Sequence, residues 1–188
     1  MRLFLALELS EEARAALSRA REIFARSLTG WRFVDPAAVH LTLRFLGEVD
    51  PEKDRAHRRA WGSAVCGFAP VRFQLTGAGV FPGPARPRVL WIGVREDPPE
   101  GRIEEIARAL EGAARAEGFP PEDRPFHPHL TLARARRDVH ATPPRDAVGE
   151  LGATVECAEV VLFRSDLGPA GARYSPLDAF PLAGTGPL

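Results

Sequence analysis

The sequence predicts an α+β fold with largely antiparallel sheets. Short apolar segments typical of strands are mixed with amphipathic helical segments, without the strict alternation that builds a parallel sheet. The helical segments carry recognisable start and stop residues. The chain has 188 residues, of which 45% are hydrophobic and 27% charged, so it can bury a core as one domain or as two closely packed halves.

The first half of the chain predicts strands separated by two helices. Residues 2–9, RLFLALEL, are short and apolar, which favours a strand. Residues 10–28 begin with a serine cap and two acidic residues and continue with apolar residues at helical spacing, so we expect a helix. Residues 31–36 indicate a short strand or a loop that ends at Pro36, and residues 39–47 alternate apolar and polar side chains as a half-buried strand does. Residues 51–65 predict the second helix.

The second half predicts two strands, the most amphipathic helix of the chain and further strands. Residues 71–94 predict a strand, a proline-glycine loop and another strand. Residues 101–117 carry an apolar stripe at helical spacing and are followed by a glycine, a typical C-terminal stop. A proline-rich loop then leads to a strand over residues 129–134, and residues 153–165 predict one or two more strands. The tail after Pro176 shows little pattern.

Composition excludes several classes of protein. The 25 basic residues balance the 25 acidic residues, so there is no overall positive field to attract nucleic acid, and any RNA or DNA ligand would have to be held locally by a few arginines. Cys66 and Cys157 form neither a disulfide framework nor a metal-type spacing. No apolar run approaches the roughly 18 residues of a membrane span, and the N-terminus lacks a secretory cleavage site. We therefore expect a cytoplasmic protein.

Thermolabile amide side chains are almost absent. The sequence has no asparagine, and Gln74 is its only glutamine. Depletion of amides is typical of proteins from heat-loving organisms, although a GC-rich genome gives a similar bias. The composition thus indicates a thermophilic source and says nothing about function.

The tetrapeptide His-Leu-Thr-Leu occurs twice, at residues 40–43 and at residues 129–132. Side chains two positions apart in a strand point to the same face. In the first copy His40, Thr42 and Arg44 are expected to share one face, and the intervening leucines and Phe45 the opposite, buried face.

The second copy repeats this arrangement. His129 and Thr131 are expected to share one face while Leu130 and Leu132 are buried. Arg134 lies one residue off that face, so it can reach the histidine only if the strand twists or bulges. Each copy therefore places an imidazole and a hydroxyl side by side, and two such strands across a groove make a single site.

Two histidines and two hydroxyls suit displacement at phosphorus. Histidine titrates near neutrality, so one ring can act as base while the other acts as acid. Threonine hydroxyls can donate to the non-bridging oxygens as charge builds on them. No metal or other cofactor is required. A lone His-x-Thr is most often structural, and His127 with His129 has the spacing of two metal ligands, but no Cys, Asp or Glu supports a metal site.

The sequence around both copies resembles the 2H phosphoesterase superfamily. The resemblance lies in FLG after the first copy and in FHPHLTLAR around the second. Within the superfamily the chain is similar to the RNA 2′,3′-cyclic phosphodiesterases, also called 2′-5′ RNA ligases or LigT-like proteins. The segments RLFLALEL, GVFPGPARPRVLWIGV and LFRSDLGPAGARYSPL extend the likeness over nearly the whole chain.

The resemblance implies a fold and an activity. The fold would be one bilobal domain over residues 1–188, with two mainly antiparallel sheets and outer helices in pseudo-two-fold arrangement, each lobe giving one motif to a central groove. The activity would be metal-independent hydrolysis of RNA 2′,3′-cyclic phosphate ends to a 2′-phosphate, with possible reversible 2′-5′ ligation. Its partners would be RNA ends, such as those of tRNA fragments or short oligonucleotides. The protein would act as a monomer and would not bind membranes.

The resemblance also implies roles for residues. His40 would protonate the leaving 3′-oxygen and His129 would activate water, with Thr42 and Thr131 on the phosphate oxygens. Further candidates for substrate binding are Arg44, Arg134 and Phe45, and Trp31 or Phe33 could stack on a base.

Two alternatives remain open. One is a cyclic phosphodiesterase for a small nucleotide such as ADP-ribose 1″,2″-cyclic phosphate. The other is a non-catalytic module that binds RNA ends or nucleotides, although such a module has no need of an acid and a base.

Overall fold

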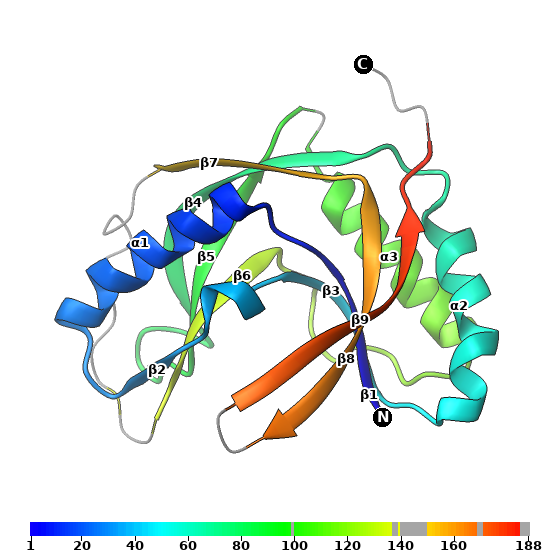
Figure 1. Ribbon diagram of the computed structural model, residues 1–188, viewed down its shortest axis with the longest axis horizontal. Coiled ribbons are helices and arrows are strands. Elements are labelled where there is room, and N and C mark those ends of the chain that lie inside the picture. The colour runs from blue at the N-terminus through cyan, green and yellow to red at the C-terminus, as the bar shows by residue number, and fades with distance from the viewer. Residues whose placement is uncertain (99, 137–138, 140–149, 169–170, 185–188) are drawn as a thin grey trace.

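The computed structural model describes residues 1–188 except 99, 137–138, 140–149, 169–170 and 185–188. Helices and strands alternate irregularly along the chain (Figure 1). In chain order they are β1 (Arg2–Leu7), α1 (Glu11–Ser27), β2 (Trp31–Phe33), the short 3-10 helix η1 (Pro36–Ala38), β3 (Leu41–Glu48), α2 (Pro51–Val65), β4 (Val71–Phe81), β5 (Val89–Glu96), α3 (Arg102–Ala116), β6 (His129–Ala135), β7 (Glu150–Cys157), β8 (Glu159–Gly168) and β9 (Gly171–Pro181).

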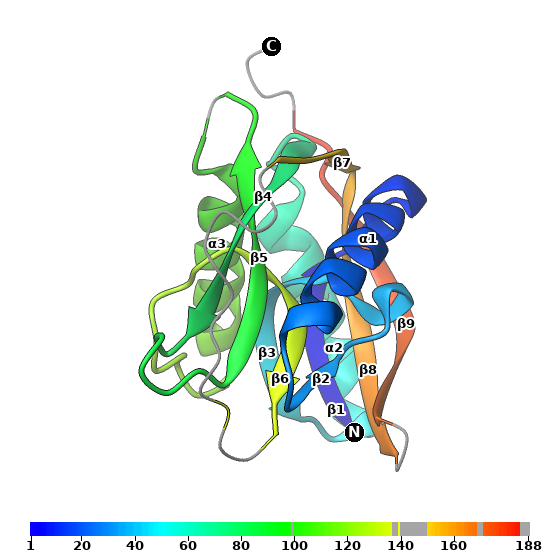
Figure 2. The same ribbon diagram turned by 90° about the vertical axis from the view of Figure 1, so that its left-hand side faces the viewer.

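The strands form one curled sheet in the order β7-β4-β5-β6-β3-β1-β8-β9, with β2 added alongside β6. Neighbouring strands pair antiparallel throughout. The two strands that carry the repeated tetrapeptide, β3 and β6, lie in the middle, with β4 and β5 on one side and β1, β8 and β9 on the other (Figure 2).

The two central strands are joined through a narrow pairing between Leu41 and Leu130. These leucines occupy the same position in the two tetrapeptides. Because β3 and β6 run antiparallel, a local two-fold axis passes between them. Continuing this register brings Thr42 to the side of His129, and His40 to the side of Thr131.

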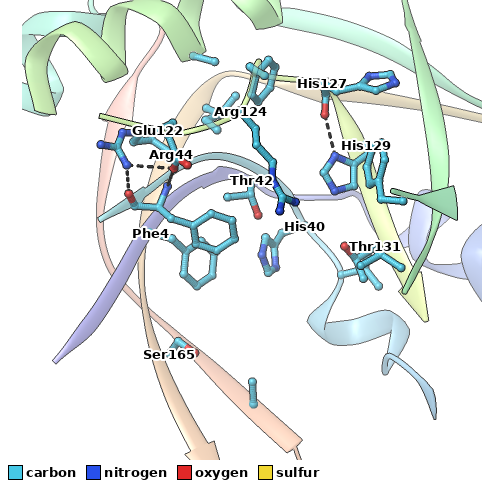
Figure 3. Close-up of a pocket in the computed structure, with 18 of the residues that line it drawn as sticks. Phe4, His40, Thr42, Arg44, Glu122, Arg124, His127, His129, Thr131 and Ser165 are labelled. Carbon is cyan, nitrogen blue, oxygen red and sulfur yellow. Dashed lines mark hydrogen bonds and ion pairs between the residues drawn. The ribbon is translucent and has the colours of Figure 1, made fainter. Parts of the chain in front are cut away.

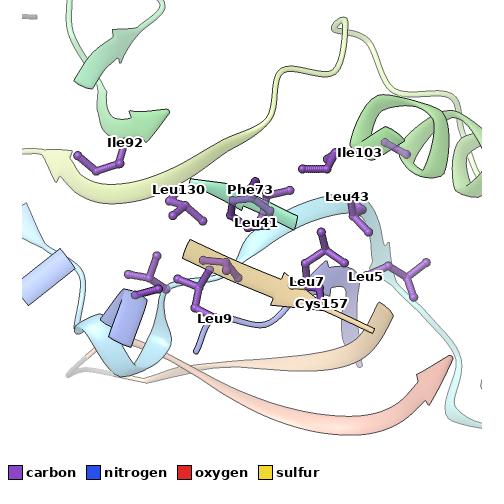
Figure 4. Close-up of a cluster of buried hydrophobic side chains, with 14 of the residues drawn as sticks. Leu5, Leu7, Leu9, Leu41, Leu43, Phe73, Ile92, Ile103, Leu130 and Cys157 are labelled. Atoms are coloured by element: carbon purple, nitrogen blue, oxygen red, sulfur yellow. The ribbon is translucent and has the colours of Figure 1, made fainter. Parts of the chain in front are cut away.

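The core lies behind the motif strands. Leu41 and Leu130 are both fully buried there, together with Leu43 and Ile92 (Figure 4). Helix α1 packs against β7, α3 against β3, and α2 against both β9 and α3. The leucines of the two tetrapeptides therefore hold the opposite, polar face of each strand in place.

The helices begin where the sequence predicts. Ser10 accepts a hydrogen bond from the Ala13 amide at 3.3 Å at the start of α1, and Asp50 accepts from the Glu52 amide at 3.0 Å at the start of α2. Helix α3 begins after Gly101, whose φ of 92° suits glycine. Its first amide, from Arg102, is satisfied by the Glu96 carboxylate at 2.9 Å.

The predicted α+β class is confirmed, with two corrections. The two expected sheets are joined into one through the Leu41–Leu130 pairing. The tail after Pro176, in which the sequence showed no pattern, belongs to β9, an 11-residue strand paired along its length with β8. Among the described residues, no helix is both long and apolar enough to cross a bilayer.

Candidate active site

A cavity of about 1370 Å³ opens over the motif strands. Both histidines and both threonines of the repeated tetrapeptide line it, as Figure 3 shows. They are His40 and Thr42 from the first copy and His129 and Thr131 from the second. Two segments far apart in the sequence therefore present the same pair of side chains to one space.

The two imidazoles are held in the same way. His40 Nδ1 lies 3.0 Å from the carbonyl oxygen of Ala38, and His129 Nδ1 lies 2.7 Å from the carbonyl oxygen of His127. A carbonyl oxygen can only accept, so Nδ1 carries the proton in each ring. In the neutral rings Nε2 is consequently the nitrogen with a free lone pair, available for proton transfer.

Aromatic rings surround His40. Phe4 stacks on the imidazole with ring centroids 4.5 Å apart, and Tyr174 meets it edge-on at 4.8 Å. Burial lowers the pKa of His40 from 6.5 to about 4, and the nearby cations Arg14 and Arg134 act in the same direction. The ring is therefore neutral in the free protein at neutral pH.

His129 has a more open setting. Phe81 meets its ring edge-on, with centroids 5.0 Å apart. Burial again lowers the pKa of His129 below its usual value, helped by the charges of His127 and Arg134. Arg134 thus lowers the pKa of both imidazoles, and it lines the same cavity.

A bulge follows the threonine in each motif strand. In β3 the pairing with β1 runs from Thr42 directly to Arg44 and skips Leu43. In β6 the pairing with β5 runs from Thr131 directly to Ala133 and skips Leu132. A bulge of one residue reverses which side chains face the groove beyond it.

The first bulge corrects the predicted faces of β3. Arg44 is 5% exposed, whereas Phe45 is 49% exposed and lines the cavity. The strict alternation expected from the sequence placed them the other way round. Phe45 is therefore available to a ligand, and its ring centroid lies 6.0 Å from that of Phe4.

The second bulge resolves the doubt about Arg134. It is exposed and lines the cavity together with His129 and Thr131. Counting from each histidine, Arg134 occupies the same place as Phe45. The two-fold arrangement thus pairs an aromatic side chain on one side of the groove with a cation on the other.

Arg44 is engaged elsewhere, which argues against the predicted contact with phosphate. Its Nε lies 2.6 Å from Glu111 Oε2, and Nη1 lies 3.0 Å from Glu122 Oε1. Its Nη2 donates to the carbonyl oxygen of Pro120 at 2.5 Å, and Nη1 also donates to the carbonyl oxygen of Phe45. We call these contacts the Arg44 clamp; they tie β3 to α3 and to the loop of residues 119–128.

Known proteins match this chain over almost its full length. A family model described as LigT like Phosphoesterase matches residues 7–91 and 94–174. The chain belongs to the LigT-like phosphoesterase family.

Individual relatives support this family. An RNA 2′,3′-cyclic phosphodiesterase of Thermus thermophilus is 40% identical over 191 aligned residues, covering 98% of this chain and 91% of the relative. One from Methanothermobacter thermautotrophicus is 34% identical, covering 97% and 99%. The crystal structure of E. coli LigT complexed with 3′-AMP is similar with a TM-score of 0.77 and 34% identity, covering 96% of this chain and 97% of that one.

Several residues of this LigT-like site were not found from the sequence. Phe4 and Tyr174 build the wall around His40. Arg124 extends from the loop of residues 119–128 into the cavity (Figure 3). Tyr174 is the only tyrosine of the chain, but nothing in a sequence pattern placed it beside His40.

Trp31 and Phe33, the two aromatic residues expected to stack on a base, both pack against the core. Trp31 is only 7% exposed and belongs to the core, so it is not available for stacking on a base. Phe33 is half-buried and packs against the same core. Within the described part of the chain, no group of three or more His, Cys, Asp or Glu residues could hold a metal ion.

Proposed function

We propose that the protein hydrolyses RNA 2′,3′-cyclic phosphate ends to 2′-phosphates without a metal. The observation that carries the proposal is the convergence of two imidazoles, each fixed through Nδ1, on one cavity also lined by two threonines. The names of the relatives and the 3′-AMP complex of E. coli LigT support the same substrate class.

The proposed reaction needs one base and one acid. Nε2 of His129 takes a proton from water, whose oxygen attacks phosphorus. The bond between phosphorus and the 3′-oxygen breaks on the far side, and that oxygen takes a proton from Nε2 of protonated His40. Thr42 and Thr131 donate to the non-bridging oxygens, and Arg134 neutralises their charge. The bond to the 2′-oxygen is kept, which gives a 2′-phosphate.

The low pKa of His40 constrains this assignment. An acid has to carry its proton, yet burial keeps His40 neutral in the free protein. A bound phosphate anion favours the imidazolium and offsets both the burial and the charge of Arg134. We therefore expect the pH profile of kcat, which reports the complex, to lie at higher pH than that of kcat/KM, which reports the free enzyme.

Finer parts of the proposal follow from the same groups. In ligation a 5′-hydroxyl takes the place of water: His129 takes its proton, its oxygen attacks phosphorus, and the 3′-oxygen leaves with a proton from His40, which gives a 2′-5′ linkage. We propose tRNA fragments or short oligonucleotides as substrates, a monomer as the working form and the cytoplasm as its place. The whole chain would act as one bilobal domain, with one motif from each half.

The test is turnover of a short RNA ending in a 2′,3′-cyclic phosphate in the presence of EDTA. Wild type is expected to give only the 2′-phosphate, and His40→Ala and His129→Ala to lose nearly all turnover. Binding without turnover by wild type would favour the non-catalytic module. Turnover confined to ADP-ribose 1″,2″-cyclic phosphate would favour the small-nucleotide enzyme, and activity lost with EDTA would exclude the two-histidine scheme.

A further inference from the structure

We infer that Arg32 and Arg136 form a second phosphate site beside the reacting one. Its ligand is the phosphodiester that joins the reacting nucleotide to its 5′ neighbour. The inference rests on the proposed function and extends it, because it says which further part of an RNA strand the enzyme holds. A substrate of two or more nucleotides would then bind better than a mononucleotide.

Three arginines gather where β2 lies alongside β6 (Figure 2). Arg32 of β2 is directly opposite Arg134 of β6 in the antiparallel register, so the two side chains point to the same face of the sheet. Arg136 follows two residues after Arg134, and its amide donates to the carbonyl oxygen of Gly30 at 2.8 Å, which continues the same register. The side chain of Arg136 therefore lies on that face as well. We call these three residues the arginine cluster.

The positive charge of the arginine cluster is not balanced by acidic side chains. Like charges directly opposite on paired strands destabilise a sheet. All three arginines are exposed, and no carboxylate among the described residues forms an ion pair with any of them. Trp31, the neighbour of Arg32 in β2, is buried in the core and holds Arg32 on the outer face. An anion between the guanidinium groups offsets their repulsion, and their planar donors suit a phosphate.

A separate recess marks the place of the second phosphate. It has a volume of about 480 Å³ and includes none of the histidines and threonines of the two motifs. Its lining consists of Arg32, Arg134, Ala135 and Arg136. Arg32 and Arg134 also line the main cavity, whereas Arg136 does not. An anion in the recess is therefore distinct from one held between the imidazoles, and the pair of Arg32 and Arg134 connects the two places.

The spacing along β6 suits successive phosphates of one strand. Two residues of a strand advance by about 6.6 Å, so Arg136 lies about that far beyond Arg134. Neighbouring phosphates of an extended RNA strand are separated by a similar distance. The proposed substrates carry the cyclic phosphate at their 3′ end, so every further phosphate lies on the 5′ side. The phosphate in the recess is therefore the one that links the reacting nucleotide to its 5′ neighbour.

The experiment compares three substrates that share the same reacting nucleotide. They are a nucleoside 2′,3′-cyclic phosphate, a dinucleotide that ends in the same cyclic phosphate, and that dinucleotide with an uncharged methylphosphonate linkage. Arg136→Gln is expected to raise KM for the ordinary dinucleotide about fivefold, which corresponds to about 1 kcal/mol. Its kcat/KM for the mononucleotide should stay within about twofold of wild type, because Arg136 lies outside the lining of the main cavity.

The methylphosphonate dinucleotide tests the contact itself. In wild type, loss of the charge on the linkage should raise KM by a factor similar to that of Arg136→Gln. In Arg136→Gln the two dinucleotides should differ much less, because a direct contact is lost only once, whichever partner is changed. The slope of log affinity against log salt concentration for the ordinary dinucleotide should also fall by about 0.7 in Arg136→Gln, as expected for one phosphate contact on a single strand.

Three further variants serve as controls. Arg136→Lys keeps the charge and should recover part of the dinucleotide affinity. Arg32→Gln changes the other side of the recess and should weaken the ordinary dinucleotide more than the methylphosphonate one. It should not lower the free energy of unfolding, because it relieves the repulsion from Arg134. Arg59→Gln removes one exposed charge on α2, away from the cavity lining, and should change no substrate.

Equal losses on the mononucleotide and the dinucleotide in Arg136→Gln would overturn the inference, because Arg136 would then act on the reacting nucleotide. A methylphosphonate effect of the same size in wild type and Arg136→Gln would overturn it as well, because the linkage would then be bound by other groups. If wild type turns over none of the three substrates, the proposed function fails instead, and the affinities of the corresponding 2′-phosphate products decide the subsite. A loss in Arg136→Gln that is confined to the ordinary dinucleotide product supports the subsite, and its absence rejects it.

Discussion

The two halves of the site share a backbone design and differ in chemistry. In both, a carbonyl two residues upstream fixes the imidazole, a leucine pairs across the local two-fold axis, and a bulge follows the threonine. The first half then adds an aromatic enclosure around His40 and the exposed ring of Phe45. The second half adds a more open histidine and the cation Arg134.

This difference shows how a symmetric frame can serve an asymmetric reaction. Hydrolysis of a cyclic phosphate needs a proton taken on one side of phosphorus and given on the other. Two identical halves would bind the substrate equally well in both directions. Unequal surroundings, one aromatic and one cationic, give the nucleotide and the phosphate separate places and so select one orientation.

The largest expected effect separates the roles of the two histidines. Removing either should lower the rate by about 10²–10⁴ on a natural substrate. If the leaving 3′-oxygen of the substrate is replaced by sulfur, the resulting thiolate leaves without being protonated. On that substrate His40→Ala should recover most of the rate and His129→Ala should not. Recovery in His129→Ala instead would show that the acid and base are exchanged.

Breaking the Arg44 clamp should lower stability most. Arg44→Met leaves Glu111 and Glu122 without their shared partner, and because both carboxylates keep access to water we expect a cost of about 1–3 kcal/mol. Chemical denaturation followed by fluorescence measures the free energy of unfolding. Glu122→Gln, at the more exposed end of the clamp, should cost less. A fully stable Arg44→Met would mean that the clamp contributes little to folding.

Replacing Arg134 with glutamine should weaken catalysis and also shift its pH dependence. Loss of a bidentate phosphate contact should lower kcat/KM by about 10- to 100-fold. The positive charge of Arg134 lowers the pKa of both histidines, so its removal raises both. Both limbs of the kcat/KM profile should then move to higher pH. A profile that keeps its position, with Arg59→Gln as reference, would place Arg134 away from the imidazoles.

The smallest effect is expected at Phe45. If its exposed ring stacks on a base, Phe45→Leu should raise KM by about fivefold, near the lower end of base-stacking energies. The change should leave kcat almost unaltered, because the ring takes no part in proton transfer. An unchanged KM, or a loss confined to kcat, would show that Phe45 does not bind the substrate. The aromatic surroundings of the first half would then consist of Phe4 and Tyr174.

Much of this site was predictable because it depends on local periodicity. The alternation of His40 with Leu41 and of His129 with Leu130 fixes which side chains are buried, so the two polar faces followed from the sequence. The family resemblance then predicted that the two faces meet in one groove. The predicted face of Arg44 was wrong for a physical reason: a bulge is set by pairing with the neighbouring strand, which the alternation within one strand does not record.

The other site residues that the sequence did not reveal also depend on long-range contacts. The loop of residues 119–128 has no periodicity, and its place depends on the buried guanidinium of Arg44, far away in sequence. Arg124 could therefore not be assigned to the cavity. The environment of His40 likewise depends on Tyr174, from the strand that the sequence did not reveal.

The Nδ1 tethers have a consequence for repeated turnover. Because both rings keep their hydrogen bond to a carbonyl, only Nε2 changes protonation, and neither ring has to rotate. One hydrolysis, as proposed, ends with His40 neutral and His129 charged, the mirror image of the starting state. That state is ready for the reverse reaction, in which the 3′-hydroxyl gives its proton to His40 and attacks phosphorus to re-form the cyclic phosphate. Whether a bound product reverts is then governed by a race between proton exchange with solvent and departure of the product.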